Sequence, residues 1–186
     1  MSTYGEESES ELARLALAAL GERRGARVLV GGLGVGYTLR EALRQEWVGH
    51  VTVIEIEPVV EVWARTYFRS FNGGALSDPR TTAITDDIGP YIRSTHKRYD
   101  AIVLDVDNGP DEAVLAQNAS LYDEAGLGVW ARRLTNGGVL AIWSARRVPG
   151  FDERLRRVFS RADIHEIPAS VRTSAADYVY VAKREP

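Results

Sequence analysis

The chain has 186 residues, of which 45% are hydrophobic and 26% are charged, and its formal net charge is -3. This composition is ordinary for a globular protein, and the balanced charge provides no basic field that would attract nucleic acid. The absence of cysteine excludes disulfides, thiolate catalysis and cysteine-based zinc sites, and no apolar run approaches the roughly 20 residues of a membrane helix. The acidic N-terminal stretch "MSTYGEESESE" is unlike a secretory signal, so we expect a cytoplasmic protein that binds neither nucleic acid nor membranes.

Strands and helices are expected to alternate along most of the chain. Residues 1–8 are expected to be frayed, and residues 10–20 show helical spacing behind a serine cap. The expected strands are 26–32, 50–57, 80–85, 99–106, 138–145 and 176–184, and the later helices are 38–46, 59–68, 87–94 (short helix or turn), 121–134 and 151–161. This order predicts right-handed crossovers and a mostly parallel sheet, with the last strand antiparallel at its edge. We expect a single α/β domain over residues 1–186.

Three glycines follow the first strand in the stretch "VLVGGLGVGYTLRE", at Gly32, Gly34 and Gly36. Glycines between a strand and a helix allow a tight turn and a close approach of the backbone to a ligand under the helix N-terminus. A plain strand-to-helix turn is the alternative. A dinucleotide fingerprint would need glycine at position 37, where this chain has Tyr37, so a smaller nucleoside cofactor is favoured over NAD.

Acidic residues close the second and third strands. Glu55 lies about 20 residues past the glycines, where an acid can accept hydrogen bonds from both ribose hydroxyls. Glu57 is its rival, but it precedes a proline that suits the first position of a helix, where an acid favours the helix dipole. Asp86 and Asp87 follow the third strand, and either can accept a hydrogen bond from an adenine amino group or cap the next helix.

The stretch "YDAIVLDVDNGPDEA" ends an apolar strand in Asp105, Asp107 and Asn108. A charge at the end of a buried strand needs a partner or a ligand, which favours a functional role for Asp105. Asp107 and Asn108 precede a Gly-Pro pair, and all of these residue types also favour simple turns.

Together these motifs resemble the spermidine synthase family of polyamine aminopropyltransferases, built on the class I S-adenosylmethionine (SAM) methyltransferase fold. The resemblance runs from Arg27 to Ser144, and it also includes "VTVIEIEP" and "YDAIVLD" followed by "LYDEAGL". It implies a doubly wound, Rossmann-like sheet of seven strands, a donor that is SAM or decarboxylated SAM, a small-molecule amine acceptor and a possible homodimer. It further implies that Glu55 holds the ribose, that Asp87 lies near the adenine and that Asp105 begins the catalytic D-x-x-D element.

The chain also departs from that family. The second aspartate of the catalytic element falls on Asn108, with Asp107 one place early, and Val35 stands where the family loop usually carries an acid. We also expect the family's N-terminal β-hairpin domain, which helps to cover the polyamine, to be absent. An acid in the loop would repel the carboxylate of SAM and help to select the decarboxylated form, and Val35 removes that repulsion.

The leading hypothesis is therefore aminopropyl transfer from decarboxylated SAM to an amine. Asp105 would orient the amine and accept its proton, while Asp107 and Asn108 would hold a cationic acceptor. Methyl transfer from SAM and a non-catalytic nucleoside-binding protein are the alternatives. Weaker candidates near the substrates are Asn118, Tyr122 and Trp143. The three histidines lack metal-ligand spacing, so no metal site is expected.

Overall fold

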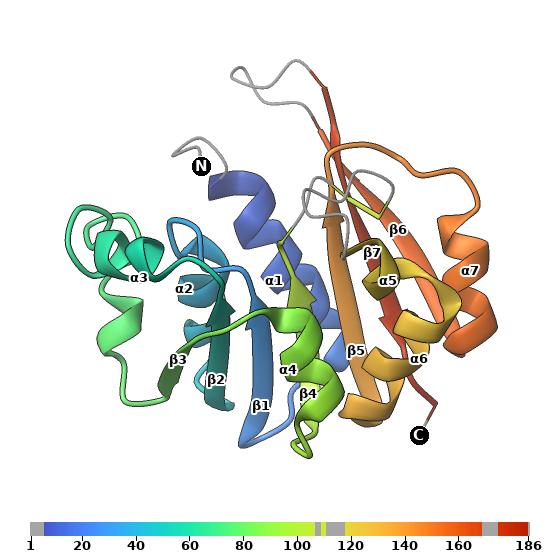
Figure 1. Ribbon diagram of the computed structural model, residues 1–186, viewed down its shortest axis with the longest axis horizontal. Helices are drawn as coiled ribbons and strands as arrows, with labels where there is room; N and C mark the ends of the chain where they lie inside the picture. The colour runs from blue at the N-terminus through green and yellow to red at the C-terminus, as the bar shows by residue number, and fades with distance from the viewer. Residues whose placement is uncertain (1–5, 107–108, 111–117, 169–174, 186) are drawn as a thin grey trace.

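A single sheet of seven strands organises the computed structural model, which describes residues 6–106, 109–110, 118–168 and 175–185 (Figure 1). The strand order is β3-β2-β1-β4-β5-β7-β6. Strands β1 to β5 run parallel, whereas β7 is antiparallel to both β5 and β6. The strands are β1 Ala26–Gly31, β2 Val48–Glu55, β3 Thr81–Thr85, β4 Tyr99–Leu104, β5 Leu134–Ser144, β6 Arg161–Ile167 and β7 Asp177–Lys183. The predicted doubly wound α/β fold is confirmed.

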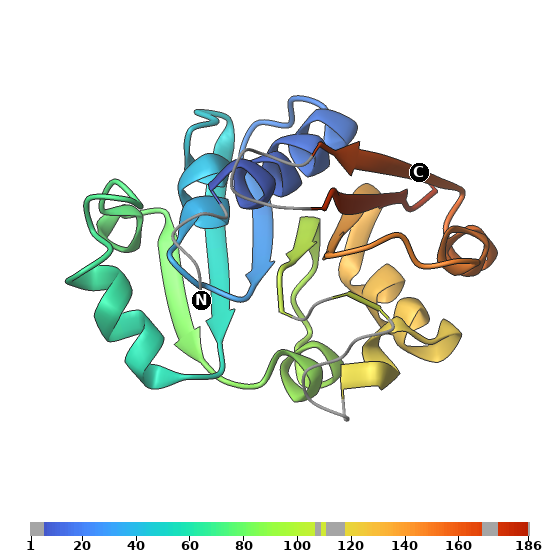
Figure 2. The same cartoon turned by 90° about the horizontal axis from the view of Figure 1, so that it is seen from above.

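Helices cover both faces of the sheet (Figure 2). One face carries α1 Glu6–Leu20, α2 Tyr37–Leu43 and α3 Pro58–Arg65, with the short 3₁₀ helix η1 Ala75–Ser77 beside them. The other face carries α4 Ile88–Ser94, α5 Ala119–Tyr122, α6 Glu124–Arg133 and α7 Phe151–Val158. Among the described helices, none is both long and apolar enough to cross a membrane.

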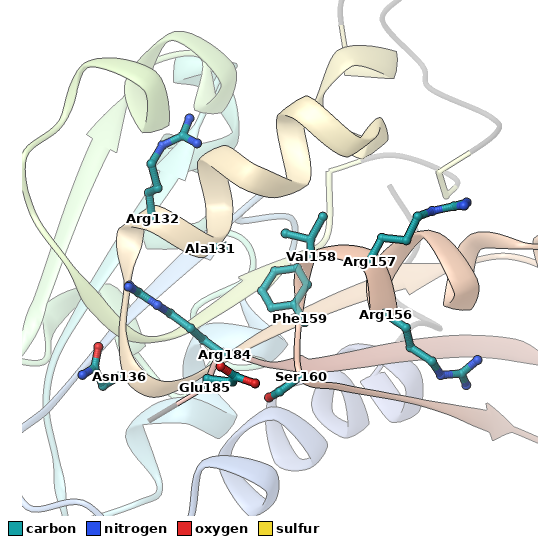
Figure 3. A pocket seen from close by; sticks show the side chains of 10 residues that line it. All are labelled: Ala131, Arg132, Asn136, Arg156, Arg157, Val158, Phe159, Ser160, Arg184 and Glu185. Carbon is teal, nitrogen blue, oxygen red and sulfur yellow. The ribbon is translucent and has the colours of Figure 1, made fainter.

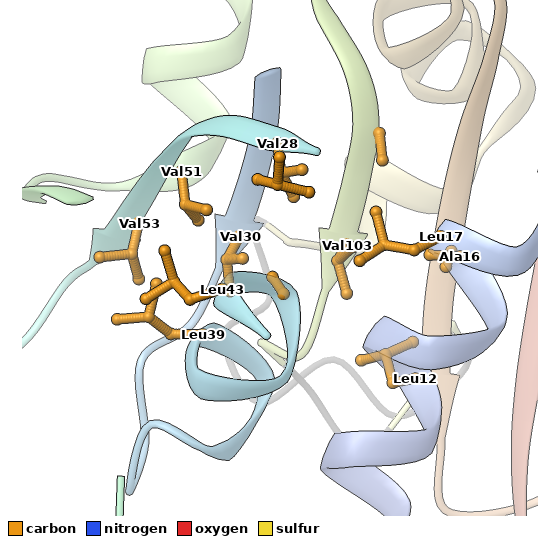
Figure 4. Packing of buried hydrophobic residues seen from close by; sticks show 14 of the residues in the cluster. Leu12, Ala16, Leu17, Val28, Val30, Leu39, Leu43, Val51, Val53 and Val103 are labelled. Atoms are coloured by element: carbon orange, nitrogen blue, oxygen red, sulfur yellow. The ribbon is translucent and has the colours of Figure 1, made fainter. Parts of the chain in front are cut away.

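Successive side chains of the central strands point alternately into two separate apolar cores, one on each face of the sheet. In β1, Val28 and Val30 pack under α1 and α2, whereas Leu29 points to the opposite core (Figure 4). Every residue of β4 is buried, as expected for a parallel strand that is covered on both faces. The apolar stripe of α1 contributes Leu12 and Leu17 to the first core, which anchors this helix across β4 and β5.

The strand order reverses between β1 and β4, which is the place where ligands bind in open α/β sheets. Gly31 of β1 pairs with Leu104 of β4, and the Asp105 backbone N–H donates to the Gly31 carbonyl at 2.9 Å. The chain therefore leaves β4 directly beside the glycine loop. The residues that follow β1, β2, β3 and β4 meet at this carboxyl edge of the sheet.

Several sequence expectations about the elements are wrong in detail. Residues 6–8 belong to α1, so Ser10 lies inside the helix and does not cap it. The segment 121–134 forms two helices, because the Asp123 carboxylate accepts from the Gly126 N–H at 2.7 Å and starts α6 afresh. The last strand, β7, is not at the edge, because it pairs on its outer side with β6. The sequence "RADIHEI" of β6 was not predicted as a strand, since polar residues interrupt its apolar positions.

Candidate functional site

A cavity of about 340 Å³ lies at the carboxyl edge of the sheet, within the range of roughly 300–1,000 Å³ typical of small-molecule sites. Acidic side chains and apolar side chains share its wall. The lining residues are Gly32, Ile54, Glu55, Ile56, Glu57, Asp86, Asp87, Ile88, Val106 and Asn118. The cavity thus offers apolar surface for a flat ring and carboxylates for the hydroxyl and amino groups of a nucleoside.

The Glu55 carboxylate links the glycine loop to the residues after β2 through two hydrogen bonds. Its Oε2 atom accepts a hydrogen bond from the Leu33 N–H at 2.9 Å, and its Oε1 atom accepts from the Glu57 N–H at 3.0 Å. Each carboxylate oxygen keeps further acceptor capacity, so these two bonds orient the group without saturating it. Glu57 is exposed and its side chain caps no helical N–H. The better-oriented carboxylate is therefore Glu55, although both line the cavity.

Asp87 has the capping role that the sequence offered as one alternative, and Asp86 and Asp87 both line the cavity. The Asp87 Oδ1 atom accepts from the Gly89 N–H at 2.9 Å and caps α4. The Asp86 Oδ1 atom accepts from the Asp87 N–H at 2.8 Å, and the Asp86 side chain is exposed. These backbone hydrogen bonds orient both carboxylates, and both residues still line the cavity.

The three glycines of the loop face different surroundings. Gly32 has φ +86° and lines the cavity, and a Cβ there would collide with the Asp105 carbonyl oxygen. Gly36 precedes α2, and a Cβ there would meet the side chain of Asn72 at 3.0 Å. Gly34 faces the Oε2 atom of Glu9, 4.0 Å from its Cβ position. Only Gly32 of the three borders the nucleoside-sized cavity.

Asp105 follows β4 and lies in a group of acidic side chains. The Thr38 hydroxyl lies 3.5 Å from Asp105 Oδ2 and 3.3 Å from the Glu9 carbonyl oxygen. Burial raises the pKa of Asp105 to about 6, Thr38 partly offsets this, and the negative charge of Asp177 adds to the rise. Burial also raises the pKa of Glu9 to about 8, with the charge of Asp105 as a further cause. Three carboxyl groups from distant parts of the chain therefore interact here.

Of the remaining residues that the sequence predicted near the substrates, some line the cavity and others do not. Asp107 and Asn108 lie outside the described residues. Asn118 is buried and lines the cavity next to the acids that follow β3. Tyr122 is buried in the core, where its ring packs edge-on against Phe151 at 6.4 Å, so it does not face the cavity. The Trp143 side chain is partly exposed.

Sequence reasoning missed Glu9, Thr38 and Asp177. Thr38 belongs to the "TLRE" motif, but its hydroxyl was given no role. Glu9 lies on the first helix and Asp177 at the start of β7, so neither follows a parallel strand at the carboxyl edge. Nothing in the local sequence distinguishes Glu9 and Asp177 from the many solvated acidic residues of this chain.

A larger hollow of about 640 Å³ lies near the opposite edge of the sheet and is lined by Arg132, Arg156, Arg157 and Arg184 among others (Figure 3). Arg132, Arg156 and Arg157 point away from one another, so no common anion site forms. Arg184 donates to the Leu134 carbonyl and Arg156 pairs with Asp152. Among the described residues, no cluster of three acidic or histidine side chains is arranged to hold a metal ion.

Comparisons with known proteins identify the family to which this chain belongs. A family model described as the spermine/spermidine synthase domain matches residues 8–148. Over 102 residues, 53% of this chain, the sequence is 39% identical to polyamine aminopropyltransferase 1 of Streptomyces coelicolor. The matched segments cover only 19% to 27% of the length of the first curated relatives.

Solved structures with low sequence identity share the fold. The spermidine synthase of Thermotoga maritima superimposes with a TM-score of 0.77 at 21% identity, covering 96% of this chain and 60% of that one. Human methyltransferase-like protein 13 in complex with SAH gives a TM-score of 0.74 at 22% identity, covering 97% of this chain and 83% of that one. At these identities the likeness concerns the fold alone.

Proposed function

The chain belongs to the spermine/spermidine synthase family, and we propose that it transfers an aminopropyl group from decarboxylated SAM to an amine acceptor. The Streptomyces relative, named as a polyamine aminopropyltransferase, supports this reaction class. The cavity at the carboxyl edge supports the donor, because its size and its mixed apolar and acidic wall suit an adenosine group.

Within this proposal, the donor nucleoside lies along the cavity at the ends of β1, β2 and β3. Glu55 accepts hydrogen bonds from the ribose hydroxyls with the capacity that its two backbone bonds leave open. Asp86 and Asp87 accept from the adenine amino group, and Ile88 and Val106 contact the ring. The sulfonium end of the donor then points past Gly32 toward Asp105.

The chemistry needs a neutral amine in line with the carbon that leaves sulfur. The amine nitrogen forms a bond to the methylene carbon while the carbon–sulfur bond breaks, and the electron pair of that bond neutralises the sulfonium. The nitrogen releases one proton, which Asp105 accepts. A pKa of about 6 makes Asp105 a stronger base than an ordinary aspartate, while it stays ionised at neutral pH.

The observation that carries the proposal is this partly buried carboxylate, which adjoins the nucleoside cavity through Gly32. The test is a turnover assay with decarboxylated SAM and a panel of diamines, polyamines and amino acids, read out as 5′-methylthioadenosine and alkylated amine by mass spectrometry. Equimolar formation of both products is expected with at least one amine. Donor binding without turnover of any amine would instead favour a non-catalytic nucleoside-binding protein.

Methyl transfer from SAM is the second candidate, and the uncharged side chain of Val35 favours it. No acid within the glycine loop itself opposes the carboxylate of SAM. The same panel assayed with SAM tests this candidate, because methyl transfer releases S-adenosylhomocysteine (SAH), whereas aminopropyl transfer releases 5′-methylthioadenosine. Methylated products with SAM and no product with decarboxylated SAM would overturn the aminopropyl proposal.

A further inference from the structure

The large apolar side chains that the described residues expose all lie in one short segment of the chain, which we call the α3 face. They are Ile56, Val59, Val62, Trp63, Tyr67 and Phe71, with exposed fractions between 38% and 75%. The segment lies at the end of the molecule that carries β3, far from β6 and α7 (Figure 2). Contiguous apolar patches of more than a few hundred Å² are rare on monomers and mark interaction sites.

The helix α3 has two apolar stripes, and only one of them faces the protein. Val60 and Ala64 are four residues apart and are buried in the core between α3 and the sheet. Val62 and Trp63 lie three and four residues after Val59, so these three side chains share a second face of the helix. All three are exposed. An ordinary surface helix would carry polar residues on this face.

The turn after α3 is held from below, so the exposure of its aromatic rings is a feature of the fold. The side-chain amide of Asn72 is buried and donates to the Ala64 carbonyl at 2.8 Å and to the Val35 carbonyl at 3.1 Å. The Arg40 guanidinium donates to the Phe71 carbonyl at 2.6 Å. These bonds fix the backbone of the turn against the end of α3, while Phe71 remains exposed. An aromatic side chain on a fixed backbone is a typical anchor of a protein interface.

The charged residues around the α3 face complement those of a second, inverted copy. Glu57 lies at the N-terminal end of α3, and Arg69 lies in the turn after its C-terminal end. Neither side chain makes an ion pair or a hydrogen bond within the part of the chain that the structure describes. Glu61 and Arg65, which lie between them in the chain, pair with each other. The face thus has an unpaired acid at one end and an unpaired base at the other.

We propose that the α3 face is a self-association interface through which two copies of this chain form a symmetric dimer. A twofold axis near Val62 and Trp63 packs the two α3 helices antiparallel, so that Glu57 of each copy meets Arg69 of the other. A standard interface buries about 800 Å² on each partner, of which a little more than half is apolar. The few hundred Å² of apolar surface on the α3 face, together with its charged rim, meet this requirement. The interface does not depend on the proposed reaction.

The charge balance of the face argues against a membrane surface as its occupant. Helices that lie on membranes carry Lys and Arg on their polar side, which anionic lipids attract. The α3 face has two acids, Glu57 and Glu61, and two bases, Arg65 and Arg69, so it has no net positive charge. A second copy of the same face provides both signs of charge at the two ends where they are needed.

Sedimentation velocity of the full chain at about 1–100 µM tests the interface, since interfaces of standard size bind in the micromolar range or more tightly. Val62→Glu places a charge at the centre of the contact, at a position that the single chain exposes, and thermal melting verifies that its fold is retained. Arg132→Gln is the matched control. It changes the net charge by the same amount, but Arg132 is exposed on α6, on the other face of the sheet.

The parent is expected to sediment as a dimer. Val62→Glu should raise the dissociation constant about a hundredfold or more, because it sets two like charges against each other in a desolvated contact, and Arg132→Gln should stay within about twofold of the parent. A parent that is monomeric over the whole concentration range overturns the inference. A dimer that Val62→Glu leaves intact also overturns it, because that dimer uses another surface.

Charge reversal tests the antiparallel arrangement. Glu57→Arg and Arg69→Glu each set like charges against one another in a dimer of identical chains, so each should weaken association about tenfold or more. In an equimolar mixture of the two variants, a mixed dimer has opposite charges at both contacts, and it should form within about threefold of the parent affinity. Single variants that associate like the parent, or a mixture without recovery, would show that the antiparallel arrangement is wrong.

Co-sedimentation with phospholipid vesicles tests the other occupant. Vesicles of phosphatidylcholine alone and of phosphatidylcholine with phosphatidylserine are used, and the parent is expected to stay in the supernatant with both. A monomeric parent that pellets with the vesicles, and that no longer pellets after Val62→Glu, overturns the dimer and assigns the α3 face to a membrane surface.

Discussion

The carbonyl oxygen of Asp105 occupies the space that a Cβ atom on Gly32 would need. The backbone after β4 thus closes onto the loop after β1, and the two segments share the boundary between the nucleoside cavity and the acidic group. Gly32 therefore belongs to the site because only a residue without a side chain leaves room for the Asp105 carbonyl oxygen. A prediction for substitution of Gly32 follows directly.

Gly32→Ala should destabilise the protein strongly and abolish nucleoside binding. Gly21→Ala provides the control, because Gly21 also has positive φ (+77°) but its Cβ would meet nothing within 4 Å. The control should lose about 1–2 kcal/mol from the left-handed backbone alone. Gly32→Ala should lose about 1–3 kcal/mol more from the clash. Urea unfolding curves measure both, and equal losses would show that the backbone near Asp105 gives way easily.

Glu55→Gln should lower nucleoside affinity by about tenfold or more, since hydrogen bonds to a charged acceptor contribute roughly 1.5–3 kcal/mol. The amide also loses one of the two backbone N–H partners, so a small drop in melting temperature is expected. Glu57→Gln is the control and should bind like the parent. If Glu57→Gln shows the loss and Glu55→Gln does not, the ribose role belongs to Glu57.

Asp105→Asn should keep nucleoside affinity and lower turnover by about 10²–10⁴, the usual contribution of a positioned base. Burial opposes the charge of Asp105, so removing that charge should not lower the melting temperature. Asp163→Asn is the control, because Asp163 is remote in β6 and pairs with Arg161. A stable Asp105→Asn variant with parental turnover would remove Asp105 from the mechanism, and a destabilised one would indicate a structural anchor.

The rate should depend on pH through Asp105. The carboxylate is the active form, so kcat/KM should rise with pH up to a pKa of about 6 and become level above it on this limb. Below that pKa the rate should fall about tenfold for each pH unit. In Asp105→Asn the residual rate should lack this limb. A parent profile that stays flat between pH 5 and 7 would contradict the role of Asp105 as base.

Glu9 should make stability depend on pH in the opposite sense to an ion-paired acid. Burial, with Asp105 beside it, raises the pKa of Glu9 to about 8, so the folded state holds a proton that the unfolded state releases above its lower pKa. Its contribution to stability is therefore full below the unfolded pKa and is lost as pH rises through about 8. Glu9→Gln should melt at a higher temperature than the parent at pH 8.5, and the gap should shrink toward pH 5. An equal gap at both pH values would contradict a raised pKa.

Much of the nucleoside half of the site follows from local sequence. Gly32, Glu55, the acid pair after β3 and Asp105 each come directly after a strand of parallel type, and parallel strands end at one edge. Once the strands were predicted, these residues had to meet. The prediction failed for β6 because its polar residues obscure the strand pattern, and Tyr122 was assigned to the crevice although its ring belongs to the core.

The sequence alone determined the fold class, the family and the residues that follow the strands, because periodicity and strand order act over short distances along the chain. The tertiary structure alone decided which acids join them. Residues 9, 105 and 177 meet because the apolar stripe of α1 packs across β4 and β5 while β7 pairs antiparallel with β5. Packing between distant segments thus decides which charged residues lie beside the glycine loop. Local sequence patterns cannot predict such contacts.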